Sequence, residues 1–447
     1  MRIRHVVTAF LLKSAEGAII LLGRRSDRVH TYPGRWAAIS GSVETECPLE
    51  QAYREVEEET GLDRASVDLV AEGWPVRFPD WELGVVWVVH PFLFACKTPA
   101  AVRPDWEHVR FEWVDPARIA SLQTVPKLAE AYASAAALCG RPDSRWAFRR
   151  IREDREHGAE EIGLWTLDGL KRAAEEALAA GRGEADLLSV MAQACRDAIA
   201  LRPSMAPVRS AALAVFGICR DLPAGKRAED ALELAIEAID RLSERREAES
   251  LAPAAASAPF IRDGARIVTL SYSFTVLSAL KESAQRVSML IVAESRPACE
   301  GRETARLAAS FGIPTELLTD AAAARAVERA DLVLFGADAL CSDCSVVNKT
   351  GTFALCCAAR YFGAETLCLA TDSKILPAGF VPPMEEMAPD ELGEAIHGVT
   401  ARNAYFELVP ADLVGRFVTG AGALPPDRLQ SRAEELRELQ DALERRK

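Results

Sequence analysis

The sequence contains no long apolar run. None of its 447 residues lies in a stretch that approaches the ~18 consecutive apolar residues of a membrane-spanning helix. The start, MRIRHVVTAFLLK, is basic and then apolar, but the run is short and no small-residue cleavage site follows it. We therefore expect no membrane partner and a cytoplasmic protein, in which the 11 cysteines stay reduced.

Positive charge is also in deficit. There are 53 Lys and Arg residues against 66 Asp and Glu residues, which gives a net charge of −13. This balance argues against general nucleic-acid binding, and a phosphate ligand would require local positive charge or a metal ion. The six histidines are scattered, and the cysteines at 341, 344, 356 and 357 lack the spacing of a zinc site.

The length predicts more than one domain. Residues 1–140 alternate strand-like apolar runs with one clear helix. Residues 141–160 form a charged segment that we interpret as a linker or a solvated connecting helix. Residues 161–250 have helical periodicity, which predicts a helical subdomain. Short strands separated by helices in residues 258–425 are typical of a doubly wound, Rossmann-like parallel sheet, and residues 426–447 predict a charged C-terminal helix. The expected fold class is α/β.

One helix in the first domain gathers carboxylates. Pro48 suits a first helical position and Gly61 a C-terminal stop. Glu55, Glu58 and Glu59 lie within one turn of each other, where like charges repel by about 0.2–0.5 kcal/mol per pair. A bound divalent cation would turn this repulsion into ligation, and oxygen ligands favour Mg²⁺ or Mn²⁺. For an isolated acidic run, a solvated helix face is the alternative interpretation.

The acidic run belongs to a longer pattern. Gly41 is followed after four residues by Glu46, and after seven more by the run REVEEETGL at 54–62. This pattern resembles the Nudix box, and the resemblance extends over about 130 residues. The family usually has five residues in the first interval, so the departure concerns Glu46 and leaves the core of the box unchanged.

The Nudix resemblance implies an α/β/α sandwich and a magnesium-dependent pyrophosphohydrolase. Its small-molecule substrate would be a nucleoside diphosphate linked to another moiety, such as a nucleoside diphosphate sugar. The metal ligands implied are Glu55, Glu58 and Glu59. The catalytic residues implied are Glu58, Glu59 and Arg54. Further candidates for a metal ligand or general base are Glu46, Glu107 and Glu112.

A second candidate site follows the strands of the C-terminal half. Polar residues occur where each predicted strand ends, and ligands bind at that edge of a doubly wound sheet. Three of them carry the positive charge that the chain otherwise lacks. The candidate sugar-phosphate-binding residues at these strand ends are Ser271, Ser273, Arg296, Asp338, Asn348, Lys349 and Lys374.

Several ordered motifs in this half resemble the translation initiation factor 2B alpha/beta/delta family, which includes isomerases of methylthioribose 1-phosphate and ribose 1,5-bisphosphate. The motifs are ESRP at 294–297, GADA at 336–339, VVNKTGT at 346–352, DSK at 372–374 and NAYFELVPADL at 403–413. The segment LRPS at 201–204 resembles an RPT segment of the family's helical subdomain, which makes Arg202 a further candidate sugar-phosphate-binding residue. The resemblance covers residues 160 to 430 and implies a homodimer formed through the C-terminal domain.

The isomerases of that family use a cysteine in a THC segment together with the aspartate of GAD. Here the segment reads Thr269-Leu270-Ser271, while the aspartate is kept as Asp338. A serine hydroxyl is a far weaker acid than a thiol. The RGA-type phosphate-binding segment is also not recognisable around Glu161. We therefore expect a domain that binds a sugar phosphate or nucleotide without isomerase activity. The alternatives are a bifunctional hydrolase and isomerase, and a non-catalytic sensing or scaffolding protein related to initiation factor 2B.

Overall fold

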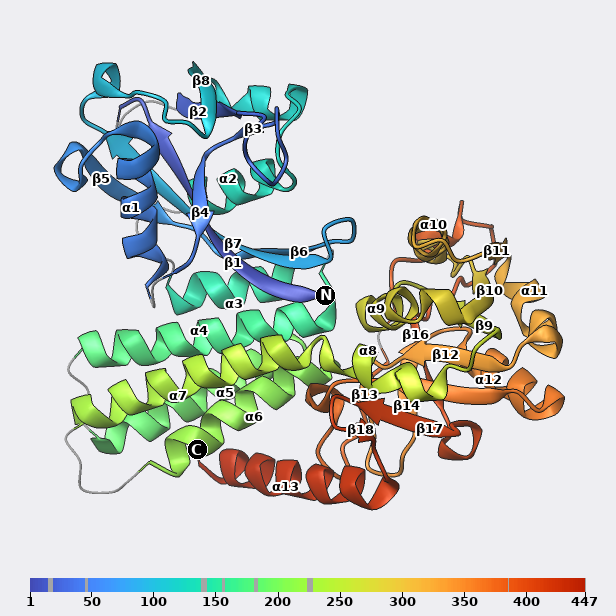
Figure 1. Cartoon of the computed structure of the whole chain (residues 1–447). Coiled ribbons are helices and arrows are strands. Elements are labelled where there is room, and N and C mark those ends of the chain that lie inside the picture. The colour runs from blue at the N-terminus through green and yellow to red at the C-terminus, as the bar shows by residue number, and fades with distance from the viewer. Residues whose placement is uncertain are drawn as a thin grey trace. The chain divides into compact units, whose positions relative to one another are not determined.

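The computed structural model describes residues 1–14, 19–44, 47–137, 143–154, 157–180, 184–222, 228–384 and 386–446 (Figure 1). The chain divides into two compact units, Met1–Pro142 (unit 1) and Asp143–Lys447 (unit 2). Both units mix helices and strands, as the sequence predicts. Within these residues, no helix combines the length and the apolar character needed to cross a membrane.

Unit 1 is built around an eight-stranded sheet with the order β3-β2-β1-β7-β5, in which β4 pairs with β1, β6 with β7 and β8 with β2. Its strands are β1 (Arg2–Leu12), β2 (Ile20–Arg25), β3 (Trp36–Ala37), β4 (Ile39–Ser42), β5 (Val67–Glu72), β6 (Val76–Asp80), β7 (Val85–Cys96) and β8 (His108–Val114). Its helices are α1 (Pro48–Thr60) and α2 (Leu128–Ala136).

The two helices of unit 1 cover opposite faces of this sheet. Strands β1 and β7 run parallel along their whole paired length, so alternate side chains point to opposite faces. Val7 and Leu11 of β1 pack in one cluster with Val56 of α1. Phe10 points the other way and meets Tyr132 of α2 edge-on, with ring centroids 5.3 Å apart. This arrangement is an α/β/α sandwich, and it fixes the side of the sheet on which the α1 glutamates lie.

Unit 2 begins with a helical part and continues into two sheets. The helical part consists of α3 (Ser144–Glu153), α4 (Ala159–Ala179), α5 (Glu184–Leu201), α6 (Ala206–Arg220), α7 (Ala228–Glu249) and α8 (Ala252–Ser257). The later helices are α9 (Phe274–Glu282), α10 (Gly301–Ser310), α11 (Asp320–Ala326), α12 (Thr352–Phe362) and α13 (Pro426–Arg445). The strands are β9 (Ala265–Leu270), β10 (Val287–Ala293), β11 (Thr315–Leu318), β12 (Leu332–Gly336), β13 (Ala339–Leu340), β14 (Val346–Lys349), β15 (Glu365–Leu369), β16 (Phe406–Val409), β17 (Arg416–Thr419) and β18 (Gly422–Ala423).

The segment expected to be a charged linker contains a packed helix. Ala147 and Ile151 of α3 are buried, and Ile151 lies in an apolar cluster with Ile162 and Trp165 of α4. The many arginines of this segment hid a short apolar stripe at i and i+4 spacing. Helix α3 is therefore part of the core of unit 2 rather than a solvated connection.

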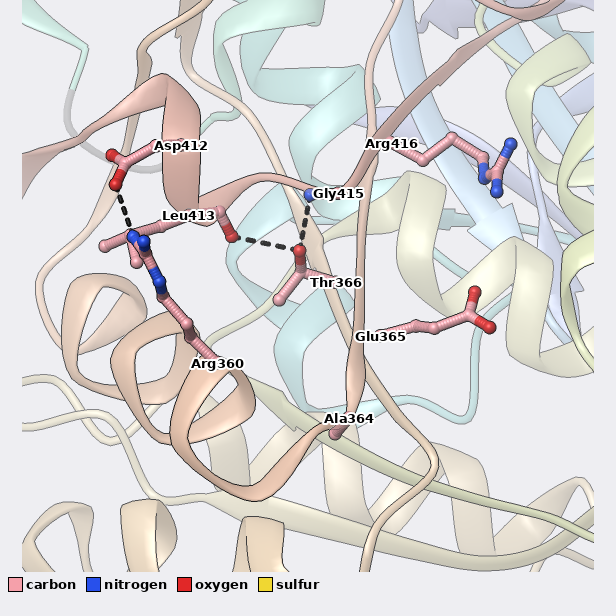
Figure 2. Close-up of a pocket in the computed structure, with 8 residues that line it drawn as sticks. All are labelled: Arg360, Ala364, Glu365, Thr366, Asp412, Leu413, Gly415 and Arg416. Atoms are coloured by element: carbon pink, nitrogen blue, oxygen red, sulfur yellow. Dashed lines mark hydrogen bonds and ion pairs between the residues drawn. The ribbon is translucent and has the colours of Figure 1, made fainter.

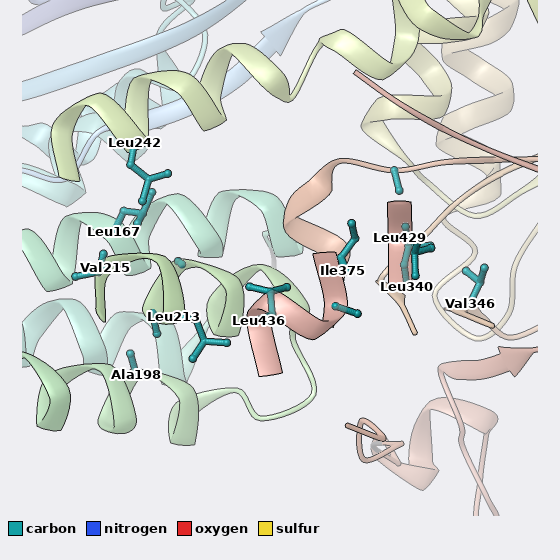
Figure 3. Packing of buried hydrophobic residues seen from close by; sticks show 14 of the residues in the cluster. Leu167, Ala198, Leu213, Val215, Leu242, Leu340, Val346, Ile375, Leu429 and Leu436 are labelled. Carbon is teal, nitrogen blue, oxygen red and sulfur yellow. The ribbon is translucent and has the colours of Figure 1, made fainter. Parts of the chain in front are cut away.

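One apolar core joins the helical part of unit 2 to its sheet. Figure 3 shows Leu213 of α6 beside Leu436 of α13. The same buried cluster includes Leu340 of β13 and Ile375, which follows the last turn after β15. The charged C-terminal helix buries Leu429, Ala433, Leu436 and Leu443 on one side and so packs against the core. The helical subdomain and the sheet therefore form one body, in which side chains from both parts can meet at one site.

The main sheet of unit 2 has the order β11-β10-β9-β12-β15-β17-β18, and its strands are parallel except for the last pair. The chain builds outward from β9 through β10 and β11, then returns to place β12 on the other side of β9. This reversal is the topological switch point of a doubly wound sheet. Strands β9 and β12 pair only at Ile267–Leu332 and Val268–Val333, so they separate towards their carboxyl ends. The sheet thus opens at the switch point.

Candidate functional site

Helix α1 fixes the glutamates of unit 1. Pro48 stands in its first turn, and Gly61 ends it in the left-handed conformation (φ 74°), donating its N–H to the Glu57 carbonyl at 2.9 Å. Glu59 is turned inward and is only 3% exposed, whereas Glu58 is exposed. The helix therefore presents one buried carboxylate beside one that solvent reaches.

The carboxylate of Glu59 is only partly satisfied. Its Oε1 accepts a hydrogen bond from the Ser40 backbone N–H at 3.0 Å. Its Oε2 is buried and has no hydrogen-bond partner among the described residues. The Nδ1 atom of the buried His108 ring lies 3.4 Å from Oε2 and 3.6 Å from Oδ1 of Asp105. A buried oxygen without a partner is costly unless a proton or a cation satisfies it.

Burial and mutual repulsion shift the acid–base behaviour of this cluster. Burial, and then the charges of Glu107, Glu55 and Asp105, raise the pKa of Glu59 well above its usual value. Burial also raises the pKa of Glu55 and of Glu107, and the charge of Glu58 adds to both shifts. Burial lowers the pKa of His108 to about 4, so its ring is neutral at neutral pH. The glutamates thus interact as one acidic cluster without a compensating His⁺.

Two glycines give this cluster its space. A Cβ atom at Gly41 would lie 1.8 Å from Oε1 of Glu55, and a Cβ atom at Gly23 would lie 2.2 Å from the His108 ring. Glu55 is held from its other side by Gln51, whose Nε2 donates to Oε1 at 2.8 Å. The first glycine of the box therefore serves the close approach of strand β4 to a carboxylate.

These residues fit a divalent cation. The set offers carboxylate oxygens, the ligands that Mg²⁺ and Mn²⁺ prefer, and one of them is a buried atom without a hydrogen-bond partner. No three His, Cys, Asp or Glu side chains within the described ranges already converge on one point.

The other candidates from the sequence separate into two groups. Glu107 joins the cluster through its charge interactions with Glu55, Glu58 and Glu59. Glu112 does not join it, because it forms a 3.0 Å ion pair with Arg110, away from the α1 side. Glu46 lies outside the described residues. Arg54 and Glu58 are both exposed on α1.

Sequence reasoning missed His108 because strand alternation hides it. Phe111 and Trp113 of β8 pack on the α1 side, so simple alternation assigns His108 to the opposite face. The pairing of β2 with β8 shifts register between Arg24 and Arg25, and His108 pairs with Arg25 beyond that shift. This irregularity turns His108 towards Glu59. No motif in the sequence predicts it.

The loop that carries Glu107 also presents an exposed aromatic ring. The Trp106 side chain is 53% exposed, and the Arg28 guanidinium lies 5.8 Å from its ring centroid. Arg28 also donates to the Trp106 carbonyl at 3.3 Å. The charge of Arg25 lowers the pKa of Glu107 against the larger effect of burial. Arg25, Arg28 and the Trp106 indole thus lie next to the acidic cluster. The guanidinium groups can bind phosphates, and the indole can stack on a nucleotide base.

The candidate site of unit 2 lies at the switch point of its sheet. Ser271 follows β9 with a φ of 57°, and its backbone N–H donates to Ser295 Oγ at 2.6 Å. A Cβ atom at Gly336, the last residue of β12, would lie 2.8 Å from Ser273 Oγ. Asp338 lies two residues after Gly336. The structure therefore brings Ser271, Ser273 and Asp338 to the place where β9 and β12 separate.

Two buried lysines complete this site. Burial raises the pKa of Asp338, and the nearby charges of Lys374 and Lys349 oppose the rise. The Lys349 ammonium lies 2.8 Å from Oε1 of Glu300 and 3.8 Å from the ring centroid of Tyr405. The Lys374 ammonium lies 4.0 Å from Oε1 of Glu160. Each lysine thus already has a carboxylate neighbour, and neither glutamate was among the residues expected from the sequence.

Three of the expected residues of unit 2 are used elsewhere. Arg202 donates from Nε to the Ile151 carbonyl at 3.0 Å and also contacts the Asp154 carbonyl, so it caps the end of α3. The amide of Asn348 donates to Thr352 Oγ1 at 2.9 Å. The Arg296 side chain is exposed, and its backbone N–H donates to Asp320 at 2.7 Å.

A cavity of about 270 Å³ lies at the opposite, amino-terminal ends of β15 and β17 (Figure 2). Its polar groups are mostly bonded to each other. Arg360 pairs with Asp412, and Thr366 Oγ1 accepts from the Gly415 N–H at 2.6 Å while donating to the Leu413 carbonyl at 3.0 Å. This cavity lies at the wrong edge of the sheet for the switch-point residues, and its internal bonding favours a structural role.

Comparison with known proteins gives one family match in each part of the chain. Residues 155–426 match the Initiation factor 2 subunit family, and residues 3–135 match the NUDIX domain. A ribose 1,5-bisphosphate isomerase of Haloterrigena turkmenica is 29% identical over 304 residues, which cover 62% of this chain and 92% of that protein. A putative translation initiation factor eIF-2B subunit 2-like protein of Pyrococcus horikoshii is 29% identical over 290 residues, 63% of this chain and 95% of that protein.

Solved structures give the same assignment for the larger unit. The translation initiation factor eIF-2B of Pyrococcus horikoshii matches with a TM-score of 0.51 at 27% identity, covering 64% of this chain and 98% of that one. The 5-methylthioribose 1-phosphate isomerase of the same organism matches with a TM-score of 0.52 at 20% identity, covering 66% and 88%, which shows a shared fold. The chain belongs to the Initiation factor 2 subunit family and carries an N-terminal NUDIX domain.

Proposed function

We propose that unit 1 hydrolyses a phosphoanhydride bond in a nucleoside diphosphate linked to another moiety, with Mg²⁺ or Mn²⁺ as cofactor. The observation that carries this proposal is the buried Glu59, whose Oε2 has no hydrogen-bond partner in the described structure and which lies among the charges of Glu55 and Glu107. A cation held by Glu55, Glu58 and Glu59 would polarise the phosphoryl oxygens of the substrate and lower the pKa of the attacking water.

The residues of the chain have separate tasks in this proposal. Ser40 orients Glu59 through its backbone N–H, and Gln51 orients Glu55. Glu58 is exposed and can accept a proton from a water on the solvent side. Glu107 is the alternative proton acceptor, since burial raises its pKa above the usual value of a glutamate.

The proposal is tested by incubating the full chain with nucleoside diphosphate conjugates and nucleoside triphosphates, with and without Mg²⁺ or Mn²⁺. Chromatography resolves the products, and nucleoside diphosphate sugars come first in the panel. Metal-dependent cleavage that Glu59→Gln abolishes supports the proposal. Turnover that persists in Glu59→Gln would overturn the role assigned to Glu59. No turnover across the panel would move the function to a non-catalytic sensing or scaffolding protein.

For unit 2 we propose ligand binding at the switch point, without isomerase activity. The separation of β9 and β12 beside Asp338, Lys349 and Lys374 supports a site for a sugar phosphate or nucleotide. Ser271 replaces the cysteine expected in the isomerases, and its hydroxyl cannot supply the same proton chemistry unaided. The H. turkmenica relative is named for its isomerase activity, so that activity is the alternative for this chain.

The alternative is tested with ribose 1,5-bisphosphate and 5-methylthioribose 1-phosphate as substrates. We expect no isomerisation by the unmodified chain. Isomerisation that is lost in both Ser271→Ala and Asp338→Asn would establish a bifunctional enzyme. Isomerisation that survives both substitutions would also remove the roles assigned to these two residues.

A further inference from the structure

A ready-made anion site follows strand β15. Thr371, Ser373 and Lys374 are each less than 9% exposed, and the hydroxyls of Thr371 and Ser373 lie 2.8 Å apart. Both hydroxyls donate to one oxygen, Oε1 of Glu160, the Ser373 bond measuring 2.7 Å. The Lys374 ammonium lies 4.0 Å from the same oxygen. Two hydroxyl donors and an ammonium group around one oxygen are the chemistry by which proteins hold phosphoryl groups.

The occupant of this site comes from a distant part of the chain. Glu160 stands in the first turn of α4, more than 200 residues before the loop that binds it. Its charge also stabilises the cation of Arg246 on α7, whose pKa burial lowers to about 10. Arg246 donates to Ser210 Oγ at 2.8 Å, so its position is fixed. Glu160 thus lies 4.0 Å from the Lys374 ammonium, and its charge also acts on the Arg246 guanidinium.

The charges of the switch-point pocket are already compensated. Oε1 of Glu300 lies 2.8 Å from the Lys349 ammonium, and Oε1 of Glu160 lies 4.0 Å from the Lys374 ammonium. The charges of both lysines also act on Asp338. Lys349, Lys374 and Arg246 therefore balance the carboxylates of Glu300, Glu160 and Asp338. A dianionic phosphate entering this site would add uncompensated negative charge unless one of the carboxylates moved away.

We propose that Thr371, Ser373 and Lys374 form a phosphate-monoester subsite that Glu160 occupies in the native chain. Glu160 acts as an internal anion, so a phosphate must displace it to bind. This inference deepens the ligand-binding proposal for unit 2: it makes the affinity for a phosphorylated ligand depend on the position of the α4 N-terminus.

The test compares the binding of ribose 5-phosphate and of inorganic phosphate by the full chain and by its Glu160→Gln variant, measured by calorimetry. Glutamine keeps the size of the side chain and removes its charge. We expect Glu160→Gln to bind both probes at least about tenfold more tightly than the unmodified chain, because the two cations then have no internal anion. Adding Lys374→Met should remove the gain. Glu175→Gln, on the same helix but without a described contact to the pocket, should bind as the unmodified chain does.

Each outcome has a separate meaning. Equal and tight binding by the unmodified chain and by Glu160→Gln would overturn the internal-anion role and leave the binding function of unit 2 standing. Binding by neither would overturn both. If Glu160→Gln folds poorly, Glu160→Asp provides the same comparison, since a side chain shorter by one methylene withdraws the carboxylate from Ser373. An unchanged affinity in a folded Glu160→Asp variant would again refute the inference.

Discussion

Replacing Glu59 by Gln tests the acidic cluster with the least disturbance of its packing. The amide oxygen can still accept the Ser40 N–H bond, and the side-chain volume hardly changes. The substitution removes the ionisable carboxyl group of Glu59. Burial and the neighbouring carboxylates raise the pKa of this group. The metal-free protein should therefore become no less stable, because a carboxylate with an unsatisfied buried oxygen is lost.

The cation response should show the opposite change. At a free Mg²⁺ concentration 100 times its dissociation constant, binding to the native state adds about 2.7 kcal/mol. For a domain of this size that corresponds to about 5–10 °C in the midpoint of the transition that responds to the cation. Glu59→Gln should lose most of this shift, and kcat should fall by about 10²–10⁴-fold if the lost carboxylate also takes part in proton transfer.

Scanning calorimetry with and without Mg²⁺, together with steady-state turnover, measures both effects. The matched control is Glu57→Gln, because Glu57 is an exposed glutamate of the same helix. The control should retain both the Mg²⁺ shift and the turnover. Equal Mg²⁺ shifts in the unmodified chain and in both variants would refute the assignment of this cluster as the cation site.

Four further results are expected. Gly41→Ala should weaken Mg²⁺ binding at least about tenfold by titration, because its Cβ would lie 1.8 Å from the Glu55 carboxylate; an unchanged affinity would show that β4 can retreat. Trp106→Ala should raise KM about tenfold or more with little change in kcat if its exposed ring stacks on the substrate, and a fall in kcat alone would contradict this role. The raised pKa of Glu59 means that the folded state binds more protons than the unfolded chain above pH 4.5, so metal-free stability should fall as pH rises from there, and Glu59→Gln should flatten this slope in thermal unfolding. The full chain should form a homodimer through unit 2, where Tyr361 is 82% exposed; light scattering that reports a monomer would remove this expectation.

The sequence alone predicted the local elements well. Helix α1, its ends at Pro48 and Gly61, and the one-turn spacing of its glutamates are encoded within 14 residues, so no tertiary contact was needed to place them. The parallel sheet of unit 2 was readable for a similar reason: each of its strands is a short apolar run bounded by polar residues.

Packing decided which charged residues belong to a site. The sequence placed Arg202 among the phosphate ligands, but the structure uses it to cap α3. The sequence did not predict the contact between Glu160 and Ser373. Such a contact, across more than 200 residues, forms only after the helical part has packed against the sheet. The register shift that turns His108 towards Glu59 is likewise absent from the sequence pattern. The sequence by itself determined the elements and the kinds of side chain that they carry, since these depend on neighbouring residues. Only the tertiary structure decided which carboxylates can bind a cation and which lie beside a lysine. Burial and charge pairing depend on every element that packs around a group.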